Sequence, residues 1–168
     1  MNSLKSCVLV RRSFNYVIGP ALLLGLRAVA RVTGYRRLSI GKLSVLGDAS
    51  FLSLCNSSVE RLERLDPILH RLLTNRPVWL FHSAKAEPYV GNLGPPWLFS
   101  VHPRAVEWGS DGMVARLVYI AFCISRFPAG YARPEEAEAT HKAVMALSHS
   151  WLESRGFPHE LAESGGFF

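Results

Sequence analysis

Five prolines within residues 75–108 place the strongest constraint on how this 168-residue chain can fold. They are Pro77, Pro88, Pro95, Pro96 and Pro103. Proline has no backbone N–H and its ring clashes with the preceding turn, so it breaks or kinks a helix interior. We therefore expect these residues to form an irregular, proline-rich middle rather than one helix, with helical segments on both sides.

The middle contains a short internal echo, because residues 77–81 (PVWLF) resemble residues 95–99 (PPWLF). Both stretches predict short strands, near 77–82 and 96–101. Trp79 and Trp97 then have two interpretations. They fill a core, as large aromatic side chains commonly do, or they anchor a partner surface. Either interpretation buries both side chains, so the alternatives stay open.

A helix is predicted before this region, over residues 57–73. Ser57 and Glu60 match a capping box, which places the helix start at Ser57. Apolar residues then recur at helical spacing, at Leu62, Leu65, Leu69, Leu72 and Leu73. Pro67 follows Asp66 and is expected to kink this helix or to restart it.

Two helices are predicted after the middle. The first takes its cap from Ser110 or Asp111 and runs to about Phe127, which is short for a membrane span and favours a buried or interfacial helix. The second is a long amphipathic C-terminal helix that starts at Pro134 and ends before Gly156. Its apolar stripe consists of Val144, Met145, Leu147, Trp151 and Leu152.

The positive charge of the chain lies in its N-terminal quarter. The net charge is +6, yet residues 1–47 hold eight basic residues and no acidic one, and the first carboxylate is Asp48. The other 121 residues hold eleven basic and thirteen acidic residues. A protein that binds nucleic acid through its folded surface usually spreads basic residues over that surface, so this distribution makes nucleic acid the less expected partner.

The N-terminal segment has the composition of a mitochondrial transit peptide, being rich in Arg, free of acidic residues and amphipathic. Arginines continue past its apolar block, which disfavours a secretory signal. Residues 14–32 also reach the length of a membrane helix if Arg27 and Arg31 extend to the lipid headgroups. Residues 36–39 (RRLS) resemble a matrix-peptidase site, so cleavage near Ser39 and retention both stay open.

The predicted organisation has three parts, and the fold class is mainly α. Residues 1–47 form a basic, apolar N-terminal helical arm, residues 48–156 form a single small domain, and residues 157–168 form a tail. We expect partner subunits and anionic lipid such as cardiolipin to contact arginine and tryptophan side chains. These residues are Arg11, Arg12, Arg27, Arg31, Arg36, Arg37, Trp79, Trp97 and Trp151.

No catalytic, cofactor or metal motif is recognisable. The six histidines and three cysteines match no zinc-ligand spacing, and no phosphate-binding glycine loop or nucleophile elbow is present. Cys123, His102 and Glu107 have the residue types of a nucleophilic triad, but only their types suggest it. We therefore expect no enzyme, no cofactor, no metal and no small-molecule substrate.

These features predict a non-catalytic accessory subunit of a large mitochondrial assembly. We place it at the inner membrane or its matrix face, in a respiratory-chain complex or the ATP synthase, because the arm is apolar as well as basic. The alternatives are a mitochondrial ribosomal protein with a basic arm, and a small mitochondrial enzyme without a recognisable motif.

Overall fold

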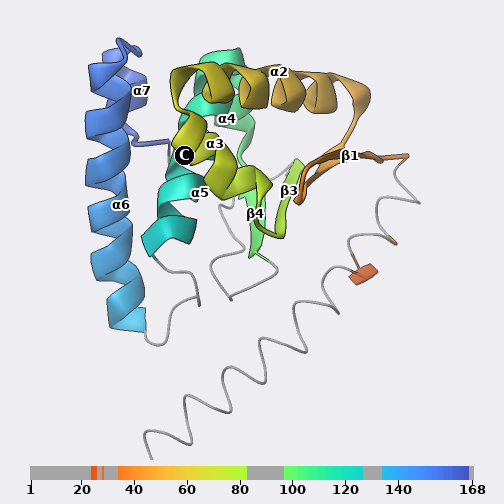
Figure 1. Ribbon diagram of the computed structural model, residues 1–168, viewed down its shortest axis with the longest axis horizontal. Helices are drawn as coiled ribbons and strands as arrows, with labels where there is room; N and C mark the ends of the chain where they lie inside the picture. The colour runs from red at the N-terminus through yellow and green to blue at the C-terminus, as the bar shows by residue number, and fades with distance from the viewer. Residues whose placement is uncertain (1–23, 26–27, 29–33, 83–96, 127–133, 167–168) are drawn as a thin grey trace, which may run out of the picture.

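The computed structural model describes residues 24–25, 28, 34–82, 97–126 and 134–166. Within these ranges the chain forms six helices and one four-stranded sheet (Figure 1). The mainly α prediction therefore fits broadly, and the sheet is the notable addition. Short strands were predicted near 77–82 and 96–101, and the structure confirms both as β3 (Val78–His82) and β4 (Trp97–Val101).

The sheet begins with a hairpin in the region expected to be an arm. Strand β1 (Arg36–Ile40) pairs antiparallel with β2 (Leu43–Gly47) across the turn at Gly41. Gly41 has φ +58°, and a Cβ there would lie 2.5 Å from the carbonyl oxygen of Thr74. Glycine at the first position of a two-residue turn suits a type II′ hairpin. Residues 36–47 thus belong to the folded domain, which begins earlier than residue 48.

The sheet continues with parallel pairing. The strand order is β1-β2-β3-β4, and β2, β3 and β4 run parallel. Parallel neighbours need a crossover connection, and between β2 and β3 it is helical. It consists of α2 (Ala49–Leu65) and α3 (Pro67–Thr74).

The start predicted for this helical segment was wrong. Helix α2 begins at Ala49, eight residues before Ser57, because the Asp48 carboxylate accepts from the Phe51 N–H and caps it. The Ser57 hydroxyl instead donates to the Leu54 carbonyl within the helix. The restart at Pro67 is confirmed, since the Asp66 carboxylate caps the first turn of α3.

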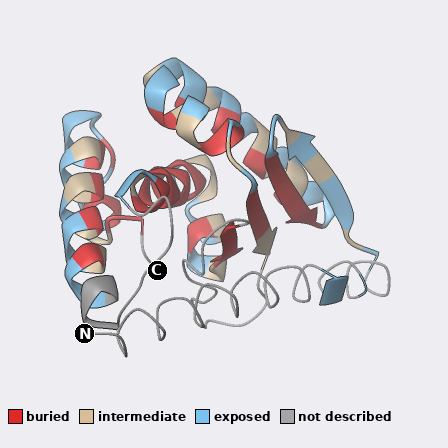
Figure 2. Ribbon diagram, turned by 60° about the horizontal axis from the view of Figure 1, so that its bottom comes forward, coloured by how far each residue is buried: buried red, intermediate tan, exposed pale blue. Residues whose placement is uncertain are grey.

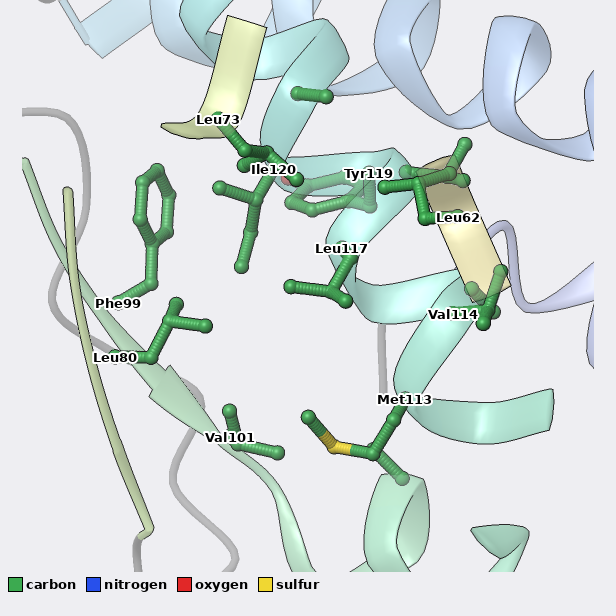
Figure 3. Close-up of a cluster of buried hydrophobic side chains, with 14 of the residues drawn as sticks. Leu62, Leu73, Leu80, Phe99, Val101, Met113, Val114, Leu117, Tyr119 and Ile120 are labelled. Carbon is green, nitrogen blue, oxygen red and sulfur yellow. The ribbon is translucent and has the colours of Figure 1, made fainter. Parts of the chain in front are cut away.

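Helix α5 forms the centre of the core. After the short α4 (Pro103–Glu107), α5 (Gly109–Arg126) lies between the sheet and the C-terminal helix (Figures 1 and 2). It is buried around most of its circumference, whereas α2 buries one side (Figure 2). Leu80 and Phe99 of the sheet point toward Leu117 and Ile120 of α5 (Figure 3). The expectation of a buried helix here is confirmed.

The C-terminal helix and the tail pack on α5. Helix α6 (Pro134–Ser154) ends two residues before Gly156, whose φ of +72° suits the turn after a helix. The predicted tail packs on the domain, because α7 (His159–Glu163) buries Leu161 and Ala162 completely. Gly166 has φ +74°, and a Cβ there would collide with the Ala115 carbonyl of α5. This close approach holds the described part of the tail against the core.

The N-terminal arm falls largely outside the described residues, including nearly all of the membrane helix expected over residues 14–32. Of the three described residues in that range, Leu24 is 65 % exposed. Among the described helices, none combines the length and apolar character that a bilayer crossing requires.

Candidate functional site

The two faces of the sheet differ in their surroundings. Leu43, Val45, Leu80, Phe99 and the other side chains of that face join the helices in the main core. The opposite face carries a second, smaller cluster. It consists of Leu46, Trp79 and Leu98, with Tyr35 and Phe81 partly buried against them.

Arg37 lies on this second face and is fixed in place from two sides. Its guanidinium lies 4.7 Å from the centroid of the Trp79 ring, and its Nη2 donates to the Ser44 hydroxyl at 2.9 Å. The register places Ser44 opposite Trp79, so that Arg37 reaches across β2 to the ring. The residue is nevertheless exposed. A cation over an aromatic face is attracted by the electrons of the ring, which limits the freedom of its side chain.

Arg36 and Lys42 complete a basic hairpin, which we define as residues 34–47. Both side chains are exposed, and no acidic residue occurs in this range. The described residues contain no ion pair to Arg36. Two side-chain contacts of Arg37 and the pairing of β1, β2 and β3 therefore bring positive charge and an aromatic ring together next to strand β1. Figure 1 shows this strand at one side of the sheet.

The predicted contact residues are found in separate places. Arg37 and Trp79 come together, whereas Arg36, the preceding residue of β1, falls on the opposite face of the strand, the side of Leu38 and Ile40. Arg11, Arg12, Arg27 and Arg31 lie outside the described residues.

Trp97 lies on the other face of the sheet, in the main core, and is 2 % exposed. The reason is the register between β3 and β4, in which Val78 pairs with Trp97 and Trp79 pairs with Leu98. This pairing is shifted by one residue from the alignment of the two similar segments, which matches Trp79 with Trp97. A shift of one residue moves a side chain to the opposite face. Hence the two similar segments place their tryptophans on opposite sides.

Trp151 makes contacts within the chain. Its Nε1 donates to the Asp66 carboxylate at 2.9 Å, and its ring lies against Phe157. Burial alone would raise the pKa of Asp66, but the N–H groups of Leu69, Trp151 and Ile68 outweigh it and hold the pKa below its usual value. One carboxylate thus joins the start of α3 to α6, and no sequence motif indicated it.

The peptidase-like residues 36–39 form most of β1. Leu38 and Ile40 pack against the main core from this strand. Cleavage before Ser39 would divide β1 and remove Leu38 from the domain. The folded structure therefore disfavours the cleaved alternative at this position.

A buried polar cluster lies between β4, α5 and α6, and the sequence analysis did not predict it. Arg116 is only 5 % exposed, and its Nη2 donates to the Ser100 carbonyl at 2.9 Å. Its guanidinium lies 5.2 Å from the Tyr119 ring, and the Tyr119 hydroxyl is 2.8 Å from His141 Nδ1. Burial, and then the Arg116 charge, lower the pKa of His141. The sequence feature that could have indicated this cluster is Arg116, a charged residue within an apolar helix.

The carboxyl ends of the parallel strands are the usual ligand site of an α/β sheet, so they test the enzyme alternative. Three titratable side chains of the described residues lie there, and two of them serve as helix caps. The Asp48 carboxylate caps α2, and His102 Nδ1 accepts from the Arg104 N–H at the start of α4. His82 stacks on Phe51 with ring centroids 4.9 Å apart. The Asp48 carboxylate and the His102 imidazole at this edge therefore have local structural roles.

The three residues whose types match a nucleophilic triad, Cys123, His102 and Glu107, do not come together in the fold. Helix α4 meets the first turns of α5, whereas Cys123 lies in the last turn, which is about 18 Å further along the helix. Cys55 is buried in the core, which raises the pKa of its thiol to about 12 and keeps it protonated. In the described ranges, no three His, Cys, Asp or Glu side chains are grouped as metal ligands.

Comparison with known protein families, with characterised proteins and with solved structures gave no match.

Proposed function

We propose that this chain is a non-catalytic accessory subunit of a mitochondrial inner-membrane assembly, in the respiratory chain or the ATP synthase. The observation that carries the proposal is the location of the charge. The N-terminal segment holds basic residues without any acidic ones, and it joins the domain at the basic hairpin. Basic residues therefore recur from the arm to strand β1 without an acidic residue between them.

The domain attached to this arm is nearly neutral. Residues 34–168 hold fourteen basic and thirteen acidic residues. Several charged groups of the domain have structural partners within it: Arg61 pairs with Asp111, Lys142 with Glu138, and Asp48 and Asp66 cap helices. The domain thus acts as a carrier that presents the arm and the hairpin, rather than as a reaction centre.

The composition of the arm supports lipid as one contact. An apolar block between arginines can insert into the headgroup layer while the cations meet anionic lipid, and cardiolipin supplies two phosphates per molecule. Nucleic acid requires the cations but not the apolar block. This difference favours the inner membrane over the mitochondrial ribosome.

The test is co-migration of the full chain, tagged at its C-terminus, in mitochondrial membranes. On a native gel, the chain should run only at high mass, and mass spectrometry of that band should identify subunits of one inner-membrane complex. In alkaline carbonate, a substantial fraction should stay with the membrane pellet. A soluble monomer would refute the proposal.

Sedimentation through a density gradient tests the alternative that the chain is a mitochondrial ribosomal protein. If the chain followed one ribosomal subunit and shifted after RNase treatment, the mitochondrial ribosome would be its assembly. An inner-membrane subunit should be insensitive to RNase.

A further inference from the structure

Strand β1 is an open edge of the sheet. It pairs only with β2 among the described strands, and three of its five residues are exposed. The other edge differs, because all five residues of β4 are buried. An open edge presents backbone donors and acceptors that can pair with a strand from another chain.

The hairpin register identifies the groups that face outward. Across a two-residue turn, Ile40 and Leu43 form a hydrogen-bonded pair, and pairs alternate from there along the ladder. Arg37 and Ser39 therefore belong to the non-hydrogen-bonded pairs. Their N–H and C=O groups point away from β2, toward the open edge.

Charge selects the kind of strand that can pair there. Strand β1 carries Arg36 and Arg37, the turn after it carries Lys42, and the hairpin contains no acidic residue. The guanidinium of Arg37 is already positioned by Trp79 and Ser44, so that pairing with a carboxylate costs it little further side-chain entropy.

We propose that β1 is a docking edge for an extended, acidic segment of a partner subunit, which adds to the sheet as a fifth strand and places carboxylates near Arg36 and Arg37. The inference rests on the proposed function, because it names the surface by which the subunit joins its assembly. A second copy of this chain fits less well, since edge-to-edge pairing would bring two basic hairpins together.

Hydrogen exchange of the full chain tests the pairing directly. We compare the isolated chain with the chain in the assembly purified from mitochondria, with amide-level resolution. The amides of Arg37 and Ser39 should exchange at least about tenfold more slowly in the assembly. The amides of Leu38 and Ile40 already pair with β2 and serve as internal controls.

Two pairs of variants test the backbone and the charge separately. Ser39→Pro removes an outward N–H but no β1–β2 hydrogen bond, while Ser39→Thr keeps the donor. Arg36→Glu reverses charge at the edge, while Arg104→Glu makes the same change at an exposed position of α4, next to the opposite edge. Ser39→Pro and Arg36→Glu should each lower incorporation about tenfold, and the two controls should not.

The outcomes separate the two proposals. Full incorporation of Ser39→Pro, or unchanged exchange at Arg37 and Ser39 in the assembly, would overturn the docking edge and leave the accessory role standing. Protection of these amides in a homodimer would assign the edge to a second copy and also overturn the proposal. A chain that is monomeric in mitochondria would overturn both proposals. Circular dichroism of each variant checks that it is folded.

Discussion

Among single residues, Arg116 stands out as a charged side chain that the fold buries. Its guanidinium satisfies the Ser100 carbonyl inside the core and lies against the Tyr119 ring. Removing one member of a buried polar cluster leaves its partners without compensation. The hydrogen bond from Arg116 to the Ser100 carbonyl thus connects α5 to β4 within an apolar interior.

Replacing Arg116 with Met keeps most of the volume but removes the donors. We expect the free energy of unfolding to fall by about 2 to 4 kcal/mol, because the Ser100 carbonyl loses its buried partner. Urea denaturation of the full chain measures this change. The control is Arg126→Met, at the exposed end of the same helix, which should change stability by no more than about 0.5 kcal/mol.

His141 makes the same cluster sensitive to pH. In the neutral form with its proton on Nε2, His141 accepts a hydrogen bond from the Tyr119 hydroxyl through Nδ1. Protonation would remove this acceptor and place a second cation near Arg116. Because the folded-state pKa is lowered from 6.5, the unfolded chain binds the proton more readily.

The contribution of His141 should therefore be complete above pH 6.5 and be lost as the pH falls through its lower folded-state pKa. Unfolding free energies of the wild type and of His141→Gln, measured from pH 8 to pH 5, give the contribution by difference. The wild type should lose more stability than the variant over this range. Equal pH dependence would show that His141 is not the responsible group.

At the scale of elements, strand β1 sets the N-terminal boundary of the folded unit. Its residues Leu38 and Ile40 contact the core, and its backbone completes the ladder with β2. A chain that begins at Gly34 keeps this strand, whereas one that begins at Ser39 loses three of its five residues.

We expect the Gly34 truncation to melt within about 2 °C of the full chain, because the removed residues precede the strand. The Ser39 truncation should lose about 2 kcal/mol, or roughly 5 to 10 °C, through the lost ladder bonds and the exposure of core side chains. Thermal denaturation followed by circular dichroism compares them. Equal melting temperatures would mean that β1 is dispensable, and cleavage before Ser39 would then be compatible with the fold.

At the scale of the whole molecule, charge divides the chain into a cationic arm and a nearly neutral domain. Residues 1–33 hold five basic residues and no acidic one. Each cation near an anionic membrane surface contributes about 1 kcal/mol, and the apolar block adds insertion.

The full chain should therefore co-sediment with vesicles that contain cardiolipin and phosphatidylcholine, and should bind phosphatidylcholine vesicles much less. The Gly34 truncation should lose most of this binding. Raising the salt concentration should weaken the electrostatic part of the binding through screening. Strong binding by the truncation would transfer the lipid contact to the domain and contradict the role of the arm.

The parts of the fold that depend on local sequence could be predicted. Pro67 starts a new helix after Asp66, and Gly156 follows the end of another. Both act through the backbone of their own segment. The start of α2 was missed for a related reason. Asp48 was available as a cap, but a later capping box at Ser57 matched the pattern better.

The candidate site could be predicted only in part. Arg37 was singled out for its charge and Trp79 for its size, but their meeting depends on the pairing of β1, β2 and β3. Such contacts join residues distant in the chain, and no local pattern encodes them. The packed tail is another example, since Gly166 meets Ala115 across about fifty residues of sequence.

The amino-acid order was enough to infer the separation of charge, the absence of recognisable catalytic motifs, the breaks between helices and the presence of two short apolar strands. These follow from composition and from the backbone preferences of single residues. The face to which each strand residue points depends instead on how distant strands pair, and the folded structure was needed to see it. Trp79 and Trp97 occupy the same position in similar segments, yet the register between β3 and β4 shifts them by one residue and places them on opposite faces of the sheet.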